Sequence, residues 1–547
     1  MPEAYARGAT EVPLLTETIS ANLRATAARF PERDALVDVS SGRRWTYAAL
    51  SSDVERLARA FLACGLAKGD RIGIWAPNLP EWILTQYASA QIGAILVNIN
   101  PAYRSHELRY VLSQAGVRML IATETFKTSN YRQMIDEVRV ECPALERVVY
   151  IATEDWPQLL ARFEETPLAA LRARESELTS ADAINIQYTS GTTGFPKGAV
   201  LSHRNILNNG YFVGRLQRFT ETERVCVPVP FYHCFGMVMG NLAATSHGAC
   251  VVIPAPSFDP VATLRAVAAE RCTALYGVPT MFIAELGDPS FGEHDLSSLR
   301  TGIMAGSPCP VEVMKRVISD MGMHEVTICY GMTETSPVST QTRADDSLER
   351  RVGTVGGVHP HVEVRIADPE SGRTLARGET GELCTRGYSV MIGYWNMPER
   401  TVEAIDSEGW MHTGDLAVMD DAGYVNIVGR IKDMVIRGGE NVYPREVEEF
   451  LFTHPDIVDV QVIGVPDRKY GEELMAWLKL RPGVVSLTAA DLRKFCAGKL
   501  AHQKIPRYVK IVEGFPMTVT GKVRKVEMRE LAVEELGLQE VGRIEHA

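Results

Sequence analysis

Short apolar runs alternate with amphipathic stretches along the first part of the chain, and this alternation predicts layered α/β structure. Thr46 can cap a helix in which the apolar residues Leu50, Val54 and Leu57 share one face, and Gly65 suits the end of that helix. Compact apolar runs then predict buried, mainly parallel strands at 71–75, 94–99, 119–122, 148–151 and 183–187.

The pattern changes near residue 430. A Gly-rich, strand-like region, 378–424, lies before this point. Beyond it Pro444 can open a helix, because the missing N–H costs little at the first helical position. We therefore expect a large N-terminal domain of layered α/β subdomains over 1–430 and a small mobile α+β domain over 431–547, with a hinge at Lys432.

Composition and charge exclude several classes of protein. The chain has 547 residues, of which 46% are hydrophobic and 23% charged, as in a folded globular enzyme. A formal net charge of -11 argues against a nucleic-acid partner. We find no transmembrane segment, no secretory signal and no CxxC pair among the ten cysteines. These features predict a cytoplasmic protein with reduced thiols.

A loop rich in glycine and hydroxyl groups follows the apolar run 183–187. Its residues are Thr189, Ser190, Gly191, Thr192, Thr193, Gly194, Phe195, Pro196, Lys197 and Gly198. The glycines let the backbone approach an anion closely, the hydroxyls add donors, and Lys197 adds a positive charge. Because Lys197 is followed by Gly198 instead of Ser or Thr, we interpret the segment as a phosphate-binding loop outside the P-loop class.

A second motif, YGMTE at 330–334, follows a strand-like run. Gly331 permits a sharp turn at a strand end, where α/β proteins collect ligands. Tyr330 offers a face for stacking on adenine, and Glu334 offers a hard oxygen ligand for Mg²⁺. Taken alone, a turn with an exposed glutamate would explain this motif equally well.

Two further motifs lie toward the C-terminus. Asp415 ends the segment 410–415 with a carboxylate suited to the hydroxyls of a ribose, and Arg430 could reach the same ribose or a phosphate. Lys522 follows a glycine turn in the segment 516–522, where a solvated loop lysine would be the simpler explanation if the motif stood alone. The four motifs occur together in one order, and that combination is far more specific than any member.

On these motifs the chain resembles the adenylate-forming (AMP-binding) superfamily from about Thr46 to Glu530. Within its acyl-CoA synthetase branch, the segments 440–449 and 516–522 are most similar to medium-chain fatty acyl-CoA ligases. The resemblance implies a small-molecule carboxylic acid as the substrate, ATP and coenzyme A as co-substrates, and Mg²⁺ as the cofactor. It also implies two half-reactions: the acid and ATP give acyl-AMP and pyrophosphate, and acyl-AMP and CoA give acyl-CoA and AMP.

The resemblance assigns residues to the nucleotide site. These are Thr189, Ser190, Gly191, Thr192, Thr193, Gly194, Lys197, Gly306, Ser307, Pro308, Tyr330, Gly331, Met332, Thr333, Asp415, Arg430 and Lys522. Tyr330 would stack on adenine, and Asp415 and Arg430 would hold the ribose. The catalytic residues would be Lys522, Thr333, Glu334 and His233, with Glu334 as the Mg²⁺ ligand and Lys522 bridging the carboxylate, the α-phosphate and the ribose.

The resemblance also places the acyl and CoA sites. The acyl pocket would be lined by Tyr232, His233, Met237, Val278, Met281, Met304, Met332 and Val338, although many of these could equally be core residues. Tyr232 stands where amino-acid-activating relatives carry an aspartate, so a buried ammonium would lack its counter-charge and amino acids are disfavoured. CoA would meet the turn Gly438, Gly439 and Glu440 after the small domain rotates at Lys432.

Several alternatives stay open at this point. The acyl group could be loaded on a separate carrier protein, or the acid could be another amine-free one, such as an aryl, short or branched acid. A nucleotide sensor without catalysis and a luciferase-like oxygenase are further alternatives from other classes. Lys499, Lys504, Arg507 and Lys510 could meet the CoA phosphates or form an ordinary solvated face. The oligomeric state is open, with a homodimer as one option.

Overall fold

The computed structural model describes residues 2–189, 196–307, 309–438, 440–518 and 522–539. Helix α2 (Tyr47–Ala63) is capped by Thr46, whose side chain accepts from the Ala49 N–H, and it ends just before Gly65. Strand β4 (Arg71–Trp75) has the expected bounds, and the other predicted strands appear within a few residues of theirs. The predicted α/β alternation is confirmed.

Seven strands form the first sheet, in the order β21-β11-β10-β5-β4-β6-β9. Their bounds are β4 (Arg71–Trp75), β5 (Ile95–Asn98), β6 (Val117–Ala122), β9 (Arg147–Tyr150), β10 (Ala183–Thr189), β11 (Lys197–Ser202) and β21 (Gly393–Tyr394). Strands β10, β5, β4, β6 and β9 are parallel, whereas β11 and β21 add an antiparallel edge. A two-stranded ribbon, β7 (Thr125–Phe126) and β8 (Ser129–Asn130), lies outside this sheet.

Nine strands form the second sheet, in the order β18-β17-β16-β15-β14-β12-β13-β2-β3. Their bounds are β2 (Asp34–Asp38), β3 (Arg43–Thr46), β12 (Arg224–Cys226), β13 (Cys250–Ile253), β14 (Ala274–Gly277), β15 (Thr301–Ala305), β16 (Glu325–Gly331), β17 (Val338–Gln341) and β18 (Gly357–Val358). The run from β16 to β2 is parallel, so the carboxyl ends of these strands meet at one edge.

A third, antiparallel sheet has the order β1-β19-β20-β22-β23. Its strands are β1 (Tyr5–Arg7), β19 (Val362–Ala367), β20 (Gly381–Gly387), β22 (Met411–Met419) and β23 (Val425–Arg430). A short 3-10 turn, Ile431–Asp433, follows β23, and the chain then enters a separate sheet. Lys432 therefore lies in the connection between two sheets.

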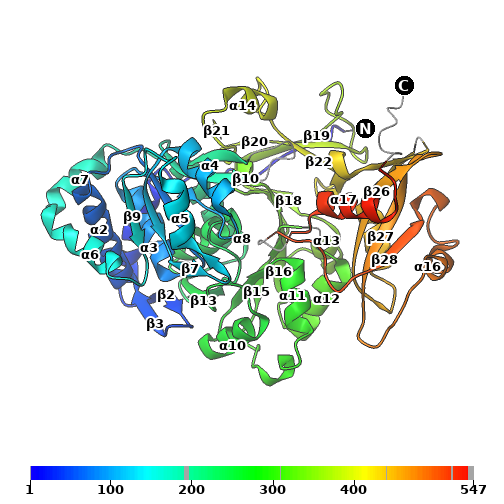
Figure 1. Cartoon of the computed structure of the whole chain (residues 1–547), viewed down its shortest axis with the longest axis horizontal. Helices are drawn as coiled ribbons and strands as arrows, with labels where there is room; N and C mark the ends of the chain where they lie inside the picture. The colour runs from blue at the N-terminus through cyan, green and yellow to red at the C-terminus, as the bar shows by residue number, and fades with distance from the viewer. Residues whose placement is uncertain (1, 190–195, 308, 439, 519–521, 540–547) are drawn as a thin grey trace.

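The fourth sheet belongs to a small C-terminal domain, at the orange and red end of the molecule (Figure 1). It has the order β25-β24-β27-β26, with β28 paired to β27. The strands are β24 (Val435–Arg437), β25 (Glu440–Val442), β26 (Ile457–Asp467), β27 (Gly471–Leu480) and β28 (Tyr508–Ile511). Its helices are α15 (Pro444–Leu451), which begins at Pro444 as predicted, α16 (Ala489–Cys496) and α17 (Lys525–Glu535).

The remaining helices pack around the sheets of the large domain. They are α1 (Ile19–Arg29), α3 (Pro80–Gln91), α4 (Ser105–Ala115), α5 (Tyr131–Arg139), α6 (Asp155–Ala161), α7 (Leu168–Ser176), α8 (His203–Leu216), α9 (Ala243–Ser246), α10 (Pro260–Glu270), α11 (Pro279–Leu286), α12 (Val311–Asp320), α13 (Leu348–Gly353) and α14 (Pro398–Ala404). A π-helix, Phe235–Leu242, precedes α9. Among the described residues, no helix combines the length and the hydropathy that a bilayer span requires.

Candidate active site

Three of the predicted motifs place a residue at the end of a strand, each in a different sheet. Thr189 ends β10, Gly331 ends β16, and Arg430 ends β23. Gly306 follows the last residue of β15, beside β16 in the second sheet. Side-chain contacts join these ends into one cluster, which we call the nucleotide-site cluster: Thr189, Lys197, Gly306, Tyr330, Glu334, Tyr394, Asp415, Arg430 and Lys522.

Glu334 joins the first and second motifs. Its Oε1 accepts hydrogen bonds from the Thr189 hydroxyl at 3.3 Å and from the Tyr394 hydroxyl at 2.8 Å. Oε2 has no hydrogen-bond partner among the residues that the structure describes. Lys197 Nζ lies 4.3 Å from the centre of the Tyr394 ring, so a cation stands close to this carboxylate. A carboxylate oxygen without a hydrogen-bond partner among the described residues, beside Thr189, fits the predicted role of Glu334 as a Mg²⁺ ligand.

Asp415 joins the second and third motifs. The Tyr330 hydroxyl donates to its Oδ2 at 2.8 Å, and Arg430 Nε lies 3.0 Å from its Oδ1. Asp415 and Arg430 are direct cross-strand partners of β22 and β23, so the sheet register itself creates the ion pair. Burial raises the pKa of Asp415, while the charge of Arg430 opposes that shift.

Lys522 brings the small domain into the cluster. A Cβ added to Gly306, at φ +91°, would lie 3.9 Å from Cε of Lys522 and 3.1 Å from Cγ1 of Val278, so the lysine chain passes the glycine closely. Burial and the nearby charge of Arg430 lower the pKa of Lys522, and Glu334 and Asp415 act in the opposite direction. All four motifs therefore meet at one place.

His233 lies beside this charged group. The Phe235 N–H donates to its Nδ1 at 3.1 Å, and Cys234 Sγ is 3.8 Å from Oγ1 of Thr333. Burial and the charge of Lys522 lower the pKa of His233 to about 3, so its imidazole is neutral at neutral pH. The π-helix Phe235–Leu242 begins directly after this turn, and such segments are frequent at functional sites.

The comparisons with known proteins bear on this cluster. Residues 23–395 match the family described as AMP-binding enzyme, and residues 446–522 match the AMP-binding enzyme C-terminal domain. The chain belongs to the AMP-binding enzyme family. This AMP-binding enzyme is 47% identical to the putative acyl-CoA synthetase YngI of Bacillus subtilis (strain 168), over 96% of this chain and 99% of that protein. It is 41% identical to the human mitochondrial medium-chain acyl-CoA ligase ACSF2, over 98% of this chain and 91% of that one.

Solved structures give the same family. ATP-bound MatB from Rhodopseudomonas palustris matches with a TM-score of 0.84 and 30% identity, over 95% of this chain and 100% of that one. The anthranilate CoA ligase AuaEII, in complex with anthranoyl-AMP, matches with a TM-score of 0.86 and 25% identity, over 96% and 99% of the two chains. The predicted resemblance is confirmed, and so is the adenylate-forming fold with a large N-terminal and a small C-terminal domain.

The residues predicted to line an acyl pocket divide between two apolar clusters. Met237, Val278, Met281 and Val338 lie in one cluster, with Tyr232 and Met332 packed against it. Met304 lies in another, on the face of β15 opposite to Ile303. Amide groups of Asn98 and Gln187 contact Sδ of Met237 at 3.2 and 3.3 Å. Two surface cavities of about 220 and 380 Å³ are lined by none of these residues.

Of the residues predicted to meet CoA, Gly438 directly follows β24 and Glu440 begins β25 in the fourth sheet. Gly438, at φ +63°, donates its N–H to the Tyr470 carbonyl at 2.7 Å, and Glu440 is exposed in β25. Lys504, Arg507 and Lys510 form ion pairs with Glu446, Asp467 and Glu535, and Lys499 lies over the Phe495 ring. Ser190, Gly191, Thr192, Thr193, Gly194, Pro308 and Gly439 lie outside the described residues.

Sequence reasoning missed Tyr394. This residue contacts both Glu334 and Lys197, which come from the second and the first motif. Its strand β21 pairs with β11, which begins at Lys197, at the edge of the first sheet. The only sequence signal is an aromatic residue in the Gly-rich region 378–424, which is too weak to single it out.

Proposed function

We propose that this chain is an ATP-dependent acid–CoA ligase that acts on medium-chain fatty acids. A carboxylate oxygen attacks the α-phosphorus of ATP, and pyrophosphate leaves. The thiol of CoA then attacks the acyl carbon, and AMP leaves. The observation that carries the proposal is the convergence of Lys522, Arg430, Asp415 and Glu334, which places a lysine of the small domain among the charges of the large one.

Charge neutralisation explains why these residues are needed. The first half-reaction brings a carboxylate to a triphosphate, and two anions repel each other unless cations lie between them. Lys197, Arg430 and Lys522 would supply these cations. Glu334 would hold Mg²⁺, which would offset the negative charge of the phosphates. Holding the carboxylate in line with the α-phosphorus can contribute about 7–11 kcal/mol.

The nucleotide would be held from two sides. Tyr330 would stack on adenine while its hydroxyl orients Asp415 toward the ribose, and Arg430 would bind the ribose or a phosphate. The turn at Gly306 and Ser307 would contact adenine through its backbone, and Thr333 would bind the α-phosphate. The segment 190–194 would complete the site for the β- and γ-phosphates.

The second half-reaction would use a different arrangement of the domains. We propose domains over 1–430 and 431–547, with rotation about Lys432. The rotation would withdraw Lys522 and bring Gly438, Gly439 and Glu440 to the acyl-adenylate. The position of Lys432 between two sheets supports this hinge, since a short turn can absorb a change in backbone angles.

The acid would be apolar and would lack an ammonium group. Met237, Val278, Met281 and Val338 are buried members of one apolar cluster, and the flexible Met side chains would suit a hydrocarbon tail. The names of the similar ligases support a medium-chain acid. A cytoplasmic location and a homodimer remain predictions.

Pyrophosphate release tests the proposal. Acids of rising chain length, together with aryl, short and branched acids, are supplied with ATP and Mg²⁺, with and without CoA. We expect release to peak at intermediate chain length and acyl-CoA to accumulate only when CoA is present. If a purified acyl carrier protein is acylated and CoA is not, the acceptor is a carrier and the CoA assignment is wrong.

A further inference from the structure

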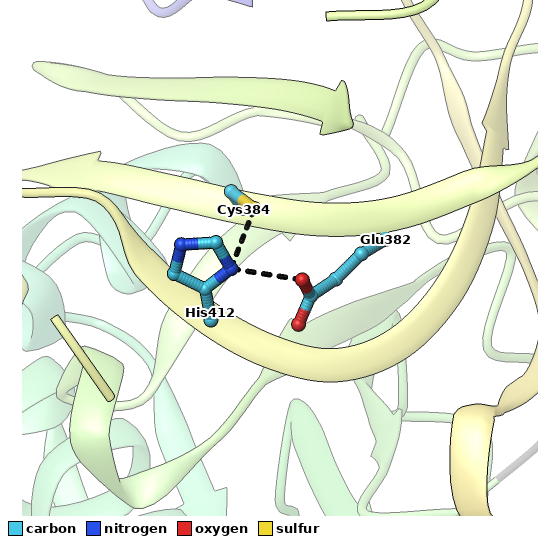
Figure 2. Close-up of side chains that lie close together, drawn as sticks. All are labelled: Glu382, Cys384 and His412. Atoms are coloured by element: carbon cyan, nitrogen blue, oxygen red, sulfur yellow. Dashed lines mark hydrogen bonds and ion pairs between the residues drawn. The ribbon is translucent and has the colours of Figure 1, made fainter. Parts of the chain in front are cut away.

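Glu382, Cys384 and His412 bring three different donor atoms together on neighbouring strands (Figure 2). Cys384 and His412 are cross-strand partners of β20 and β22. Oε2 of Glu382 lies 2.8 Å from Nδ1 of His412, and Sγ of Cys384 lies 3.6 Å from the same nitrogen. Glu382 and Cys384 are buried, and His412 is half-buried. Such a group could hold a metal ion or could form an ion pair between Glu382 and His412.

The contacts of His412 favour the ion pair. Contacts with Cys384 and Glu382 raise the pKa of His412 to about 10, so the imidazole is a cation at neutral pH. A cationic imidazole has N–H groups on both nitrogens and no lone pair for a metal. Its other nitrogen, Nε2, lies 3.6 Å from Oδ2 of Asp406, a second carboxylate. A metal ion would have to displace the proton that both carboxylates stabilise.

The second oxygen of Glu382 reaches the backbone next to Asp415. Its Oε1 accepts the Gly414 N–H at 2.9 Å. The Thr413 hydroxyl donates to the Leu383 carbonyl at 2.7 Å, and it also accepts the Asp415 N–H at 3.1 Å. The pairing register of β20 and β22 shifts at this point, as it does where a bulge re-aims a side chain beside a site. Gly414, at φ +71°, makes the turn that points Asp415 at Tyr330 and Arg430.

We propose that Glu382 is a positioning residue for Asp415, with His412 holding the Glu382 carboxylate against the Gly414 N–H. One carboxylate thereby ties two neighbouring strands together at the residue before Asp415. This inference rests on the proposed function, in which Asp415 binds the ribose hydroxyls. Without the hydrogen bond from Gly414 N–H to Glu382, Asp415 would stay in the site, but its carboxylate would no longer be held in one orientation toward the ribose.

Discrimination between nucleotides tests the proposal. The ratio of kcat/KM for ATP to that for 2′-deoxy-ATP and 3′-deoxy-ATP is measured by acid-dependent pyrophosphate release. We expect Glu382→Ala to lower this ratio about tenfold, through a higher KM for ATP and an unchanged KM for the acid. Glu382→Gln keeps an acceptor for the Gly414 N–H and should retain most of the ratio. The proposal is overturned if Glu382→Ala has a lower kcat but keeps the ATP to deoxy-ATP ratio of the unaltered protein.

The matched control is Glu363→Ala. Glu363 lies on β19 of the same sheet and pairs with Arg386, so we expect an unchanged ratio.

Asp415→Ala distinguishes a failure of the ribose-binding role of Asp415 from a failure of the positioning role of Glu382. If Asp415→Ala keeps the ratio, the ribose role of Asp415 fails. If Asp415→Ala loses it while Glu382→Ala keeps it, only the positioning role fails. Should Glu382→Ala not fold, His412→Gln, which removes the cation, is expected to lower the ratio, and an unchanged ratio there counts against the proposal.

Discussion

The hydroxyl of Tyr394 donates a 2.8 Å hydrogen bond to Glu334, and the ring of the same tyrosine lies 4.3 Å from Nζ of Lys197. One side chain thus orients the proposed Mg²⁺ ligand and supports a proposed phosphate-binding cation. The two contacts use different parts of Tyr394, so a substitution can separate them.

Tyr394→Phe removes the hydroxyl and keeps the ring under Lys197. A hydrogen bond to a charged group contributes about 1.5–3 kcal/mol, so we expect the adenylation rate to fall at least about tenfold. The Mg²⁺ concentration for half-maximal rate should rise as well, because Glu334 loses its fixed orientation. Steady-state pyrophosphate release at varied Mg²⁺ measures both. Tyr424→Phe, which removes a hydroxyl bonded to Asp346, is the control and should leave both values unchanged.

Lys522→Ala should lower adenylation by roughly a hundredfold or more, since removing one preorganised donor to a developing charge costs about that much. Thioester formation from supplied acyl-AMP should be spared. Stopped-flow assays of each half-reaction measure the two rates. Lys479→Ala removes an exposed cation of the same domain and should affect neither. Equal loss of both half-reactions would contradict a role for Lys522 in the first alone.

The pKa of Lys522 gives this prediction a pH dependence. Burial and Arg430 lower the pKa of Lys522, and the proposed role of Lys522 in adenylation needs its protonated form. The adenylation rate should therefore fall as pH rises, at a pH below the ordinary lysine range. A pH profile of kcat/KM for ATP, which reports the ionisations of the free enzyme, shows this decline. A rate that stays level up to the ordinary lysine pKa would argue against a cationic role.

Lys432→Pro should leave adenylation largely intact and slow thioester formation. Proline fixes one backbone angle in the turn Ile431–Asp433, and the proposed rotation needs that turn to change conformation. Single-turnover transfer of the acyl group to CoA measures the effect. Lys432→Ala removes the same side chain without fixing the backbone, so transfer should be slower in the proline variant than in the alanine variant. Normal transfer in the proline variant would remove the rotation from the mechanism.

His412→Gln should lose stability in a pH-dependent way. Contacts in the folded protein raise the pKa of His412 from 6.5 to about 10, so the folded state binds the proton more tightly than the unfolded state. The stabilisation is full below about pH 6.5 and declines to zero as pH rises through about 10. The difference in Tm between the unaltered protein and the variant should thus be larger at pH 6 than at pH 10. An equal difference at both values would show that the pair contributes no proton-linked stability.

Local structure was predictable because short-range physics decides it. A capping threonine, apolar residues on one face and a terminal glycine define helix α2, and a compact apolar run defines β4. Four site motifs were also readable, because their chemistry lies within a few consecutive residues. The acid-activating family followed from their order.

Contacts across the sheets were not predictable in the same way. Tyr394 lies 60 residues from Glu334 in sequence, and only the pairing of β21 with β11 brings the two together. The register shift between β20 and β22, which gives Glu382 its contact with Gly414, likewise leaves no short-range signal. The placement of Met304 was predictable from the sequence. Successive residues of a strand point to opposite faces of the sheet, so Met304 and its neighbour Ile303 pack in different apolar clusters.

The small domain carries its apolar clusters entirely within itself. Both are built from residues after 434, and they include Val462 and Trp477 respectively. Its described contacts with the large domain include polar ones, such as the 2.8 Å hydrogen bond from Arg445 to the Ile427 carbonyl. Polar contacts of this kind can be exchanged for water at little net cost. If the small domain rotates as proposed, the balance between its two positions should respond to small energies, so that whichever nucleotide or thioester is bound would decide the resting shape of the enzyme.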